Sequence, residues 1–97
     1  ILNKDDFVEA YFNLGEVFRR LGRHPEALES YRRCLQLGMS HPRLYLQISR
    51  VHAIQGETEE ALKWLRRVPL PRAADRRNLS EQMPELEPIL ELLESSN

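Results

Sequence analysis

The segment "EALESYRRCLQLG" (Glu26–Gly38) and the later segment "EALKWLRRVPLPR" (Glu60–Arg72) begin with the same three residues and contain the same arginine pair. A shift of 34 residues aligns them without a gap, and it gives eight identities between residues 11–33 and 45–67. A fixed period of this length indicates a repeat architecture, in which each unit buries its apolar face against its neighbours. The chain therefore contains the same structural unit twice.

Each copy is predicted to form two helices. Asp5 or Asp6 is the expected N-cap of the first helix and Thr58 that of the fourth, because their side-chain oxygens accept from free backbone N–H groups. Glycine is expected where a helix ends and proline in a first turn, where its missing N–H is not needed. These positions are Gly22 and Pro25 in the first copy and Pro42 and Gly56 in the second.

The spacing of apolar residues predicts which helix faces are buried. On the first helix the expected buried stripe is Ala10, Leu14, Val17, Phe18 and Leu21. Small side chains are expected where two antiparallel helices approach closely. These are Gly15 and Ala27 in the first copy and Ser49 and Ala61 in the second.

The stretches "YFNLGEVFRRLGRHPEALESY" and "YLQISRVHAIQGETEEALKWL" resemble the tetratricopeptide repeat, with an aromatic residue, a small residue, a turn glycine and an Ala-Leu pair in register. The resemblance covers roughly residues 8–70 and departs from the pattern at Ser49 and His52. It implies a right-handed α-solenoid whose concave side is lined by the first helix of each repeat. It also implies a scaffold for protein–protein contacts.

The predicted fold class is all-α, a right-handed α-solenoid of two helix-turn-helix repeats plus a C-terminal capping helix. A single domain spans residues 1–97, with repeat one at about 8–41, repeat two at about 42–70 and a capping segment at about 71–97. Pro69 and Pro71 should end the fourth helix near Val68. Pro84 and Pro88 predict a turn and then a short helix near Pro88, while residues 69–79 are either loop or contain a short helix around Arg72–Arg77.

The sequence offers little support for catalysis, and we expect no enzyme, no cofactor and no metal site. His24 and His41 precede prolines at helix starts, which favours capping or turn roles, and His52 is expected to be a half-buried packing residue. Cys34, on an apolar stripe, is expected to be a small buried hydrophobe. With one cysteine, no leader and no long apolar run, a cytoplasmic, non-membrane protein is the expectation.

Binding of a protein or peptide partner in the groove that the resemblance implies is the main functional hypothesis. Phe12 and Leu46 are apolar residues 34 positions apart on the face where solvent is expected, which suggests an anchor strip. The alternative is that neighbouring repeats or the C-terminal segment cover them. The candidate groove residues are Phe12, Asn13, Glu16, Arg20, Arg43, Leu46, Gln47 and Arg50.

Three further interpretations stay open. Residues 19–79 contain twelve arginines and Lys63 against six acids, so this basic middle either presents solvated faces, or binds the acidic residues 80–97, or binds a polyanion such as nucleic acid. One branch of the tetratricopeptide repeat family binds the terminal carboxylate of a partner through a set of polar side chains, a carboxylate clamp. Asn13 and Arg43 match part of this clamp, but Gln47 stands at a position where the clamp has arginine. Uncapped repeat ends leave self-association open.

Overall fold

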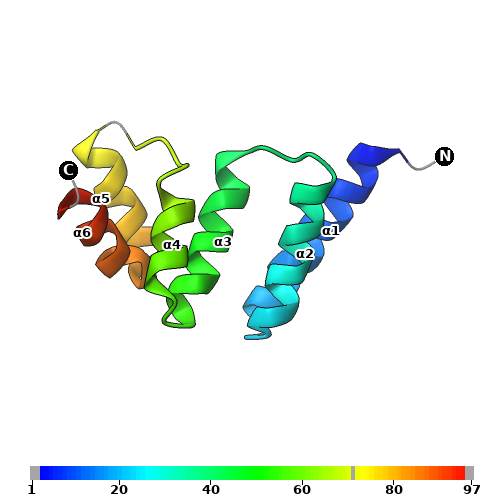
Figure 1. Ribbon diagram of the computed structural model, residues 1–97, viewed down its shortest axis with the longest axis horizontal. Coiled ribbons are helices and arrows are strands. Elements are labelled where there is room, and N and C mark those ends of the chain that lie inside the picture. The colour runs from blue at the N-terminus through cyan, green and yellow to red at the C-terminus, as the bar shows by residue number, and fades with distance from the viewer. Residues whose placement is uncertain (1–2, 71, 96–97) are drawn as a thin grey trace. The chain divides into compact units, whose positions relative to one another are not determined.

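The computed structural model describes residues 3–70 and 72–95, and in these residues it contains helices and no strand. The elements are α1 (Lys4–Arg20), α2 (His24–Gln36), α3 (Pro42–Ile54), α4 (Thr58–Leu65), α5 (Ala73–Gln82), the short 3₁₀ helix η1 (Pro84–Leu86) and α6 (Glu87–Ser95) (Figure 1). The expected all-α fold of two helical hairpins and a C-terminal helix is confirmed. No helix in the described part of the chain is both long enough and apolar enough to cross a bilayer.

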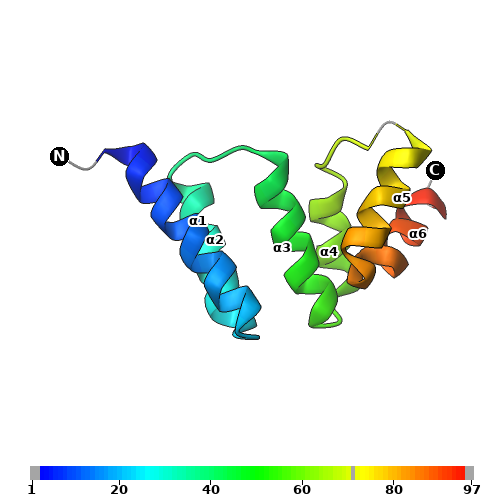
Figure 2. The same cartoon turned by 180° about the vertical axis from the view of Figure 1, so that it is seen from behind.

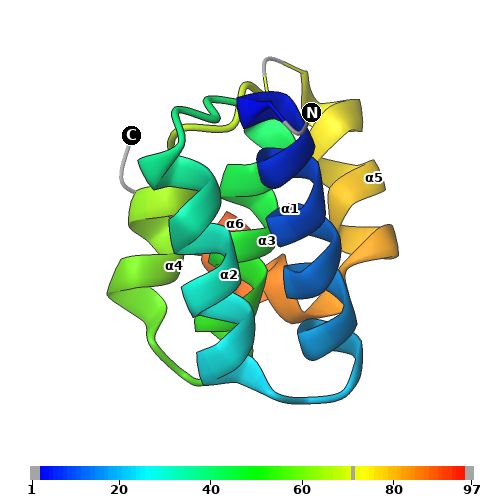
Figure 3. The same ribbon diagram turned by 90° about the vertical axis from the view of Figure 1, so that its right-hand side faces the viewer.

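The chain divides into two compact units, Ile1–Leu44 and Tyr45–Asn97. In the first unit α1 and α2 lie side by side as a hairpin (Figure 2, Figure 3). The second unit contains α3 from Tyr45 onward, α4, and the C-terminal elements α5, η1 and α6. Each unit has its own packed interior.

Glycine ends both first helices of the repeats, as the sequence predicts. Gly22 and Gly56 have φ of 76° and 79°, a left-handed conformation that glycine adopts without a Cβ penalty. The next residue then donates its N–H back to the helix: Arg23 to the carbonyl of Phe18 at 2.9 Å, and Glu57 to that of His52 at 2.9 Å. The same C-terminal closure therefore recurs 34 residues apart.

The predicted N-caps are wrong by one to three residues. Asn3 caps α1: its side chain accepts from the N–H of Asp6 at 3.1 Å, and the Asp6 carboxylate accepts from the N–H of Asn3 at 3.0 Å. Thr58 is the first residue of α4, and the N-cap is Glu57. Glu57 closes α3 with its N–H and opens α4 with its carbonyl, so this one residue serves the ends of both helices.

The interior of the first unit depends on a close approach of α1 and α2. Gly15 faces the Tyr31 ring so closely that a Cβ at residue 15 would lie 2.5 Å from the Cε1 atom of Tyr31. Tyr31, Ala27 and Cys34 of α2 are fully buried. The prediction that small residues allow the helices to approach is confirmed here.

The predicted buried stripe of α1 is wrong. Leu14, Val17 and Leu21 are 43%, 50% and 65% exposed, and the buried residues of α1 are instead Phe12, Gly15 and Glu16. The reason is that α2 packs along the Gly15 side of α1 and covers only that side. Apolar spacing identified the helix correctly, but it did not identify which face meets α2.

The second hairpin also closes through a small residue. The Ser49 hydroxyl of α3 donates to the carbonyl of Ala61 in α4 at 2.6 Å, and both residues are fully buried. A hydrogen bond of this kind satisfies a polar group that would otherwise be costly to bury. Ser49 therefore serves the same close approach as Gly15 does 34 residues earlier.

The C-terminal segment packs against α4. Its apolar side chains form a buried cluster with those of α4, here called the C-terminal cluster, which comprises Ala61, Leu65, Leu79, Leu86, Ile89 and Leu90.

The prolines act as predicted, because η1 begins at Pro84 and α6 follows with Pro88 in its first turn. The fourth helix ends at Leu65, three residues before the expected Val68, whose N–H donates to the Leu65 carbonyl in a final turn. For residues 69–79 the sequence predicts either loop or a short helix, and the part from residue 73 onward is helix, because residues 73–82 form α5.

Candidate functional site

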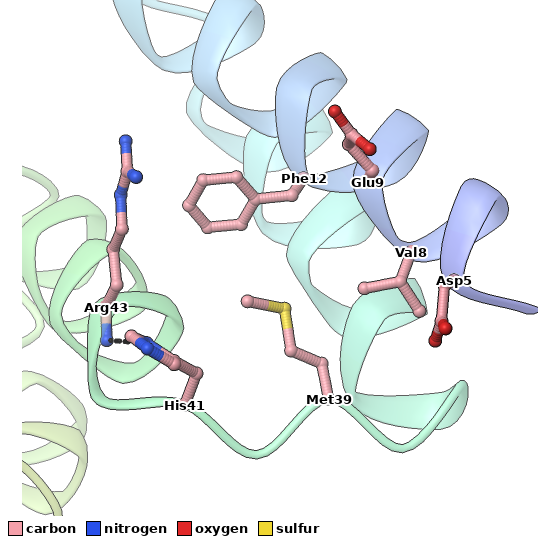
Figure 4. Close-up of a pocket in the computed structure, with 7 residues that line it drawn as sticks. All are labelled: Asp5, Val8, Glu9, Phe12, Met39, His41 and Arg43. Atoms are coloured by element: carbon pink, nitrogen blue, oxygen red, sulfur yellow. Dashed lines mark hydrogen bonds between the residues drawn. The ribbon is translucent and has the colours of Figure 1, made fainter.

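The first unit contains a cavity of about 340 Å³ with a mainly apolar lining. Figure 4 shows the side chains that line it, which come from α1, from the loop after α2 and from the start of α3. They are Asp5, Val8, Glu9, Phe12, Met39, His41 and Arg43. All seven belong to the unit that ends at Leu44.

The apolar part of the cavity is formed by Val8, Phe12 and Met39. Val8 and Phe12 lie one helical turn apart on α1, so their side chains share a face. The Phe12 ring is held from behind by the buried Tyr31, with ring centroids 5.9 Å apart and planes tilted by 52°. Phe12 is only 9% exposed, so the cavity opens over a firmly packed side chain.

Cys34 connects the two apolar walls of the cavity. Its Sγ donates to the carbonyl of Val8 at 3.6 Å, and its own carbonyl accepts from the N–H of Met39 at 3.0 Å. Burial raises the pKa of the Cys34 thiol to about 11, so the group stays protonated and can donate at neutral pH. The expectation that Cys34 is a small buried residue is confirmed.

Charged groups surround the apolar part on two sides. The guanidinium carbon of Arg43 lies 5.2 Å from the centroid of the Phe12 ring, a cation–π distance. Asp5 and Glu9 lie on the α1 side, both exposed. Within the described residues, none of these three charges takes part in an ion pair.

His41 fixes the backbone that presents Arg43. Its Nδ1 accepts from the N–H of Arg43 at 3.0 Å, directly before the first turn of α3 (Figure 4). This confirms the capping role expected of His41, whereas His24 is the first residue of α2 and its buried Nδ1 has no hydrogen-bond partner within the described residues. The Nδ1 atom of His41 must be unprotonated to accept its bond, so the ring acts here as a structural acceptor.

The structure brings two of the predicted groove residues together in the cavity, Phe12 and Arg43. Asn13 and Arg20 are exposed on α1 and do not line it. Glu16 is buried between α1 and α2, where its Oε1 accepts from the Tyr31 hydroxyl at 2.7 Å and its Oε2 from Arg19 at 2.9 Å. Both carboxylate oxygens of Glu16 are therefore occupied within the hairpin.

The Glu16 network also affects Tyr31. Burial, and then the hydrogen bond and the negative charge of Glu16, raise the pKa of the Tyr31 hydroxyl well above its usual value. A buried hydroxyl needs a partner, and Glu16 supplies the acceptor. The sequence-based assignment of Glu16 to a groove did not consider this internal role.

The three remaining predicted residues lie in the second unit. Leu46 is half-buried and packs against the C-terminal cluster, and Gln47 is 5% exposed. Arg50 forms an ion pair with Glu85, which lies in η1 of the C-terminal segment. For Leu46 this packing agrees with the alternative that the chain's own C-terminal segment covers it. The ion pair of Arg50 agrees with the interpretation that the basic middle binds the acidic residues 80–97.

Sequence reasoning missed five of the lining residues. Asp5, Val8 and Glu9 precede Phe12 by seven, four and three positions, so the helical periodicity of α1 could have placed them on its face. Met39 and His41 lie in the loop between α2 and α3, where no periodic signal exists. They join the cavity because the loop turns back toward α1.

A tetratricopeptide repeat profile matches residues 6–68, which is more than half of the chain. Comparison with curated proteins and with solved structures gave no significant match. Repeats of this kind generally mediate protein–protein interaction and are typically non-catalytic. The two hairpins, their 34-residue register and this match together establish that the chain belongs to the tetratricopeptide repeat family.

Proposed function

We propose that this chain binds a segment of a partner protein at the cavity of the first unit, with one apolar side chain of the partner inserted beside Phe12. The observation that supports this most is an apolar floor next to three charges, Asp5, Glu9 and Arg43, that form no ion pair within the described residues. Such a lining is typical of sites that bury an apolar group and orient it with a few polar contacts.

The apolar contact supplies most of the binding energy. A volume of about 340 Å³ accommodates a leucine, methionine or phenylalanine side chain. Burying such a side chain contributes about 1.5–3 kcal/mol. An exposed ion pair contributes only about 0.2–1 kcal/mol, so the surrounding charges act mainly on orientation and specificity.

The charges indicate the chemistry of the partner segment. Asp5 and Glu9 favour a basic residue on the α1 side of the inserted side chain. Arg43 favours an acidic residue or a backbone carbonyl on the opposite side. The proposed ligand is therefore a segment with an apolar anchor between a basic and an acidic position.

The wider groove remains part of the proposal. Asn13 and Arg20 are exposed on α1 and are available to extend the contact beyond the cavity. Leu46, Gln47 and Arg50 are less available, because each is at least partly buried in the second unit. We therefore propose Phe12, Met39 and Arg43 as the principal contacts.

Two arrangements behind the rival functions gain no support from the contacts. Arg32 and Arg33 both pair with Glu29, so this arginine pair is not a free phosphate site. A carboxylate clamp would use the position of Gln47, whose side chain is buried. Neither arrangement favours nucleic acid or a terminal carboxylate over the cavity.

Selection from a library of random twelve-residue peptides on the immobilised chain tests the proposal. We expect the selected peptides to share an apolar residue flanked by opposite charges. Affinity for the best peptide, measured by fluorescence polarisation, should fall at least about tenfold in Met39→Asp, because a charge then faces the inserted side chain.

Two arginine variants provide the matched comparison. Arg43→Glu should weaken binding and reselect peptides with a basic residue at the acidic position. Arg77→Glu makes the same charge change on the exposed surface of α5 and should leave the affinity within about twofold. Selected peptides that bind Met39→Asp as tightly as the unmodified chain would refute the site.

A further inference from the structure

We propose that the chain has a second binding surface, at the C-terminal end of α4, that takes an acidic peptide segment. The surface is the cationic patch of Lys63, Arg66 and Arg67 together with the Trp64 ring. It lies in the second unit, and none of its residues lines the cavity of the first. The proposal therefore does not depend on the function assigned to that cavity.

The internal repeat shows that this patch differs from its counterpart by charge. In the first repeat Glu29 neutralises the arginine pair, with Arg32 at 3.1 Å and Arg33 at 3.8 Å. In the second repeat the arginine pair is kept at residues 66 and 67, but Lys63 stands in the place of the glutamate. One substitution in register thus turns a neutralised helix face into a patch of three positive charges.

No residue in the described part of the chain neutralises the patch through an ion pair. All three charged side chains of the patch are exposed. The acidic C-terminal segment pairs elsewhere, with Glu85 on Arg50 and Glu94 on Arg76. Three like charges within one turn repel one another, although the negative end of the helix dipole partly offsets this.

An aromatic platform holds two of the cations in place. Trp64 and Tyr45 lie with ring centroids 5.8 Å apart. The Arg67 guanidinium lies 4.5 Å from the Trp64 centroid and 5.7 Å from that of Tyr45, and the Lys63 ammonium lies 5.8 Å from Trp64. In the first repeat the position of Trp64 is occupied by Ser30, so the platform is specific to the second.

This arrangement suits a carboxylate-bearing ligand. A guanidinium held against an aromatic face loses little further freedom when its N–H groups bind a carboxylate in a two-pronged contact. Lys63 adds a second positive charge against the same ring. Two or three neighbouring Asp or Glu side chains of a partner would satisfy the patch.

The charges around the patch favour a short acidic peptide over nucleic acid. Nucleic acid presents a continuous series of phosphates and needs a basic track along its path. Here Glu59 and Glu60 lie one turn before Lys63 on the same helix, and the chain as a whole has a net charge of −1. These acids would repel an extended polyanion but leave room for a few carboxylates.

Trp64 is the only tryptophan in the chain, so its fluorescence reports on this patch. The probe is a capped octapeptide of alternating Asp and Glu, and the matched control is the same peptide of Asn and Gln. We expect a saturable change in Trp64 emission with the acidic peptide alone, which weakens as salt is raised. Lys63→Glu restores the residue type of the first repeat, and it should lower the affinity about fivefold.

The chain's other lysine gives the control for net charge. Lys4→Glu makes the same charge change at the start of α1 and should alter the affinity less than twofold. Equal losses in Lys63→Glu and Lys4→Glu, or no saturable change with the acidic peptide, would overturn the proposal. Tighter binding of an octamer of deoxythymidine than of the acidic peptide would also overturn it, in favour of nucleic acid.

Discussion

The two hairpins have the same 34-residue register, but different side chains stand at the positions where their helices approach. In the first, Gly15 leaves room for the large Tyr31 ring; in the second, Ser49 stands in register with Gly15 and Leu65 with Tyr31. From the first hairpin to the second, the side chain on the first helix becomes larger and the side chain on the second helix becomes smaller. The residues at these two positions therefore differ as a pair between the repeats.

The hairpins also differ in what covers them. In the second, α4 is backed by the C-terminal segment, with Leu86, Ile89 and Leu90 buried beside it. In the first, Leu14 and Val17 of α1 remain exposed. A repeat sequence alone thus does not determine burial, because burial depends on which segment packs alongside.

The largest expected effect concerns the cover on the second hairpin. Leu86 is fully buried in the C-terminal cluster, and Leu86→Ala should lower the free energy of unfolding by about 2–5 kcal/mol through the cavity it leaves. Leu92, 40% exposed in the same segment, is the control, and Leu92→Ala should cost less than about 0.5 kcal/mol. Urea denaturation followed by circular dichroism measures both. A loss of stability in Leu86→Ala as small as that in Leu92→Ala would show that the segment does not stabilise α4.

The next effect tests the pairing of volumes in the first hairpin. Gly15→Ala places a methyl group against the buried Tyr31 ring, whose hydroxyl is held by Glu16, and it should cost about 1–3 kcal/mol. The double variant Gly15→Ser with Tyr31→Leu, which copies the second hairpin, should be more stable than Gly15→Ser alone. If adding Tyr31→Leu lowered the stability of Gly15→Ser further, the pairing would be disproved.

A smaller effect appears at alkaline pH. Because the pKa of Cys34 is raised from 9.0 to about 11 in the folded chain, unfolding releases a proton above pH 9 and stability falls as the pH rises. Between pH 8 and pH 10 the loss should be about 1 kcal/mol. Cys34→Val, which introduces the residue found in register at position 68, should remove this loss. An unchanged pH dependence in that variant would assign the effect to other groups.

Local chemistry made much of the fold predictable. Gly22 and Gly56 end helices, and Pro42 begins one, because their backbone preferences act within a single turn. The close approach at Gly15 and Ser49 followed from residue size alone. These features need no knowledge of distant parts of the chain.

The rest depended on contacts between distant segments. The buried side of α1 could not be read from its spacing, because its apolar residues occupy two faces and α2 covers only one. Glu16 is buried because the hydroxyl of Tyr31, fifteen residues later, requires an acceptor. Met39 joins the cavity through the path of a loop, which leaves no periodic trace in the sequence.

The most direct test of the proposed function uses the chain's two methionines as built-in reporters. Met39 lines the cavity of the first unit, whereas Met83 packs against the C-terminal cluster of the second. With ¹³C-labelled methionine methyl groups, titration of a selected peptide should shift the Met39 signal and leave the Met83 signal in place. A bound peptide that shifts Met83 alone, or neither signal, would contradict binding at the Phe12 cavity.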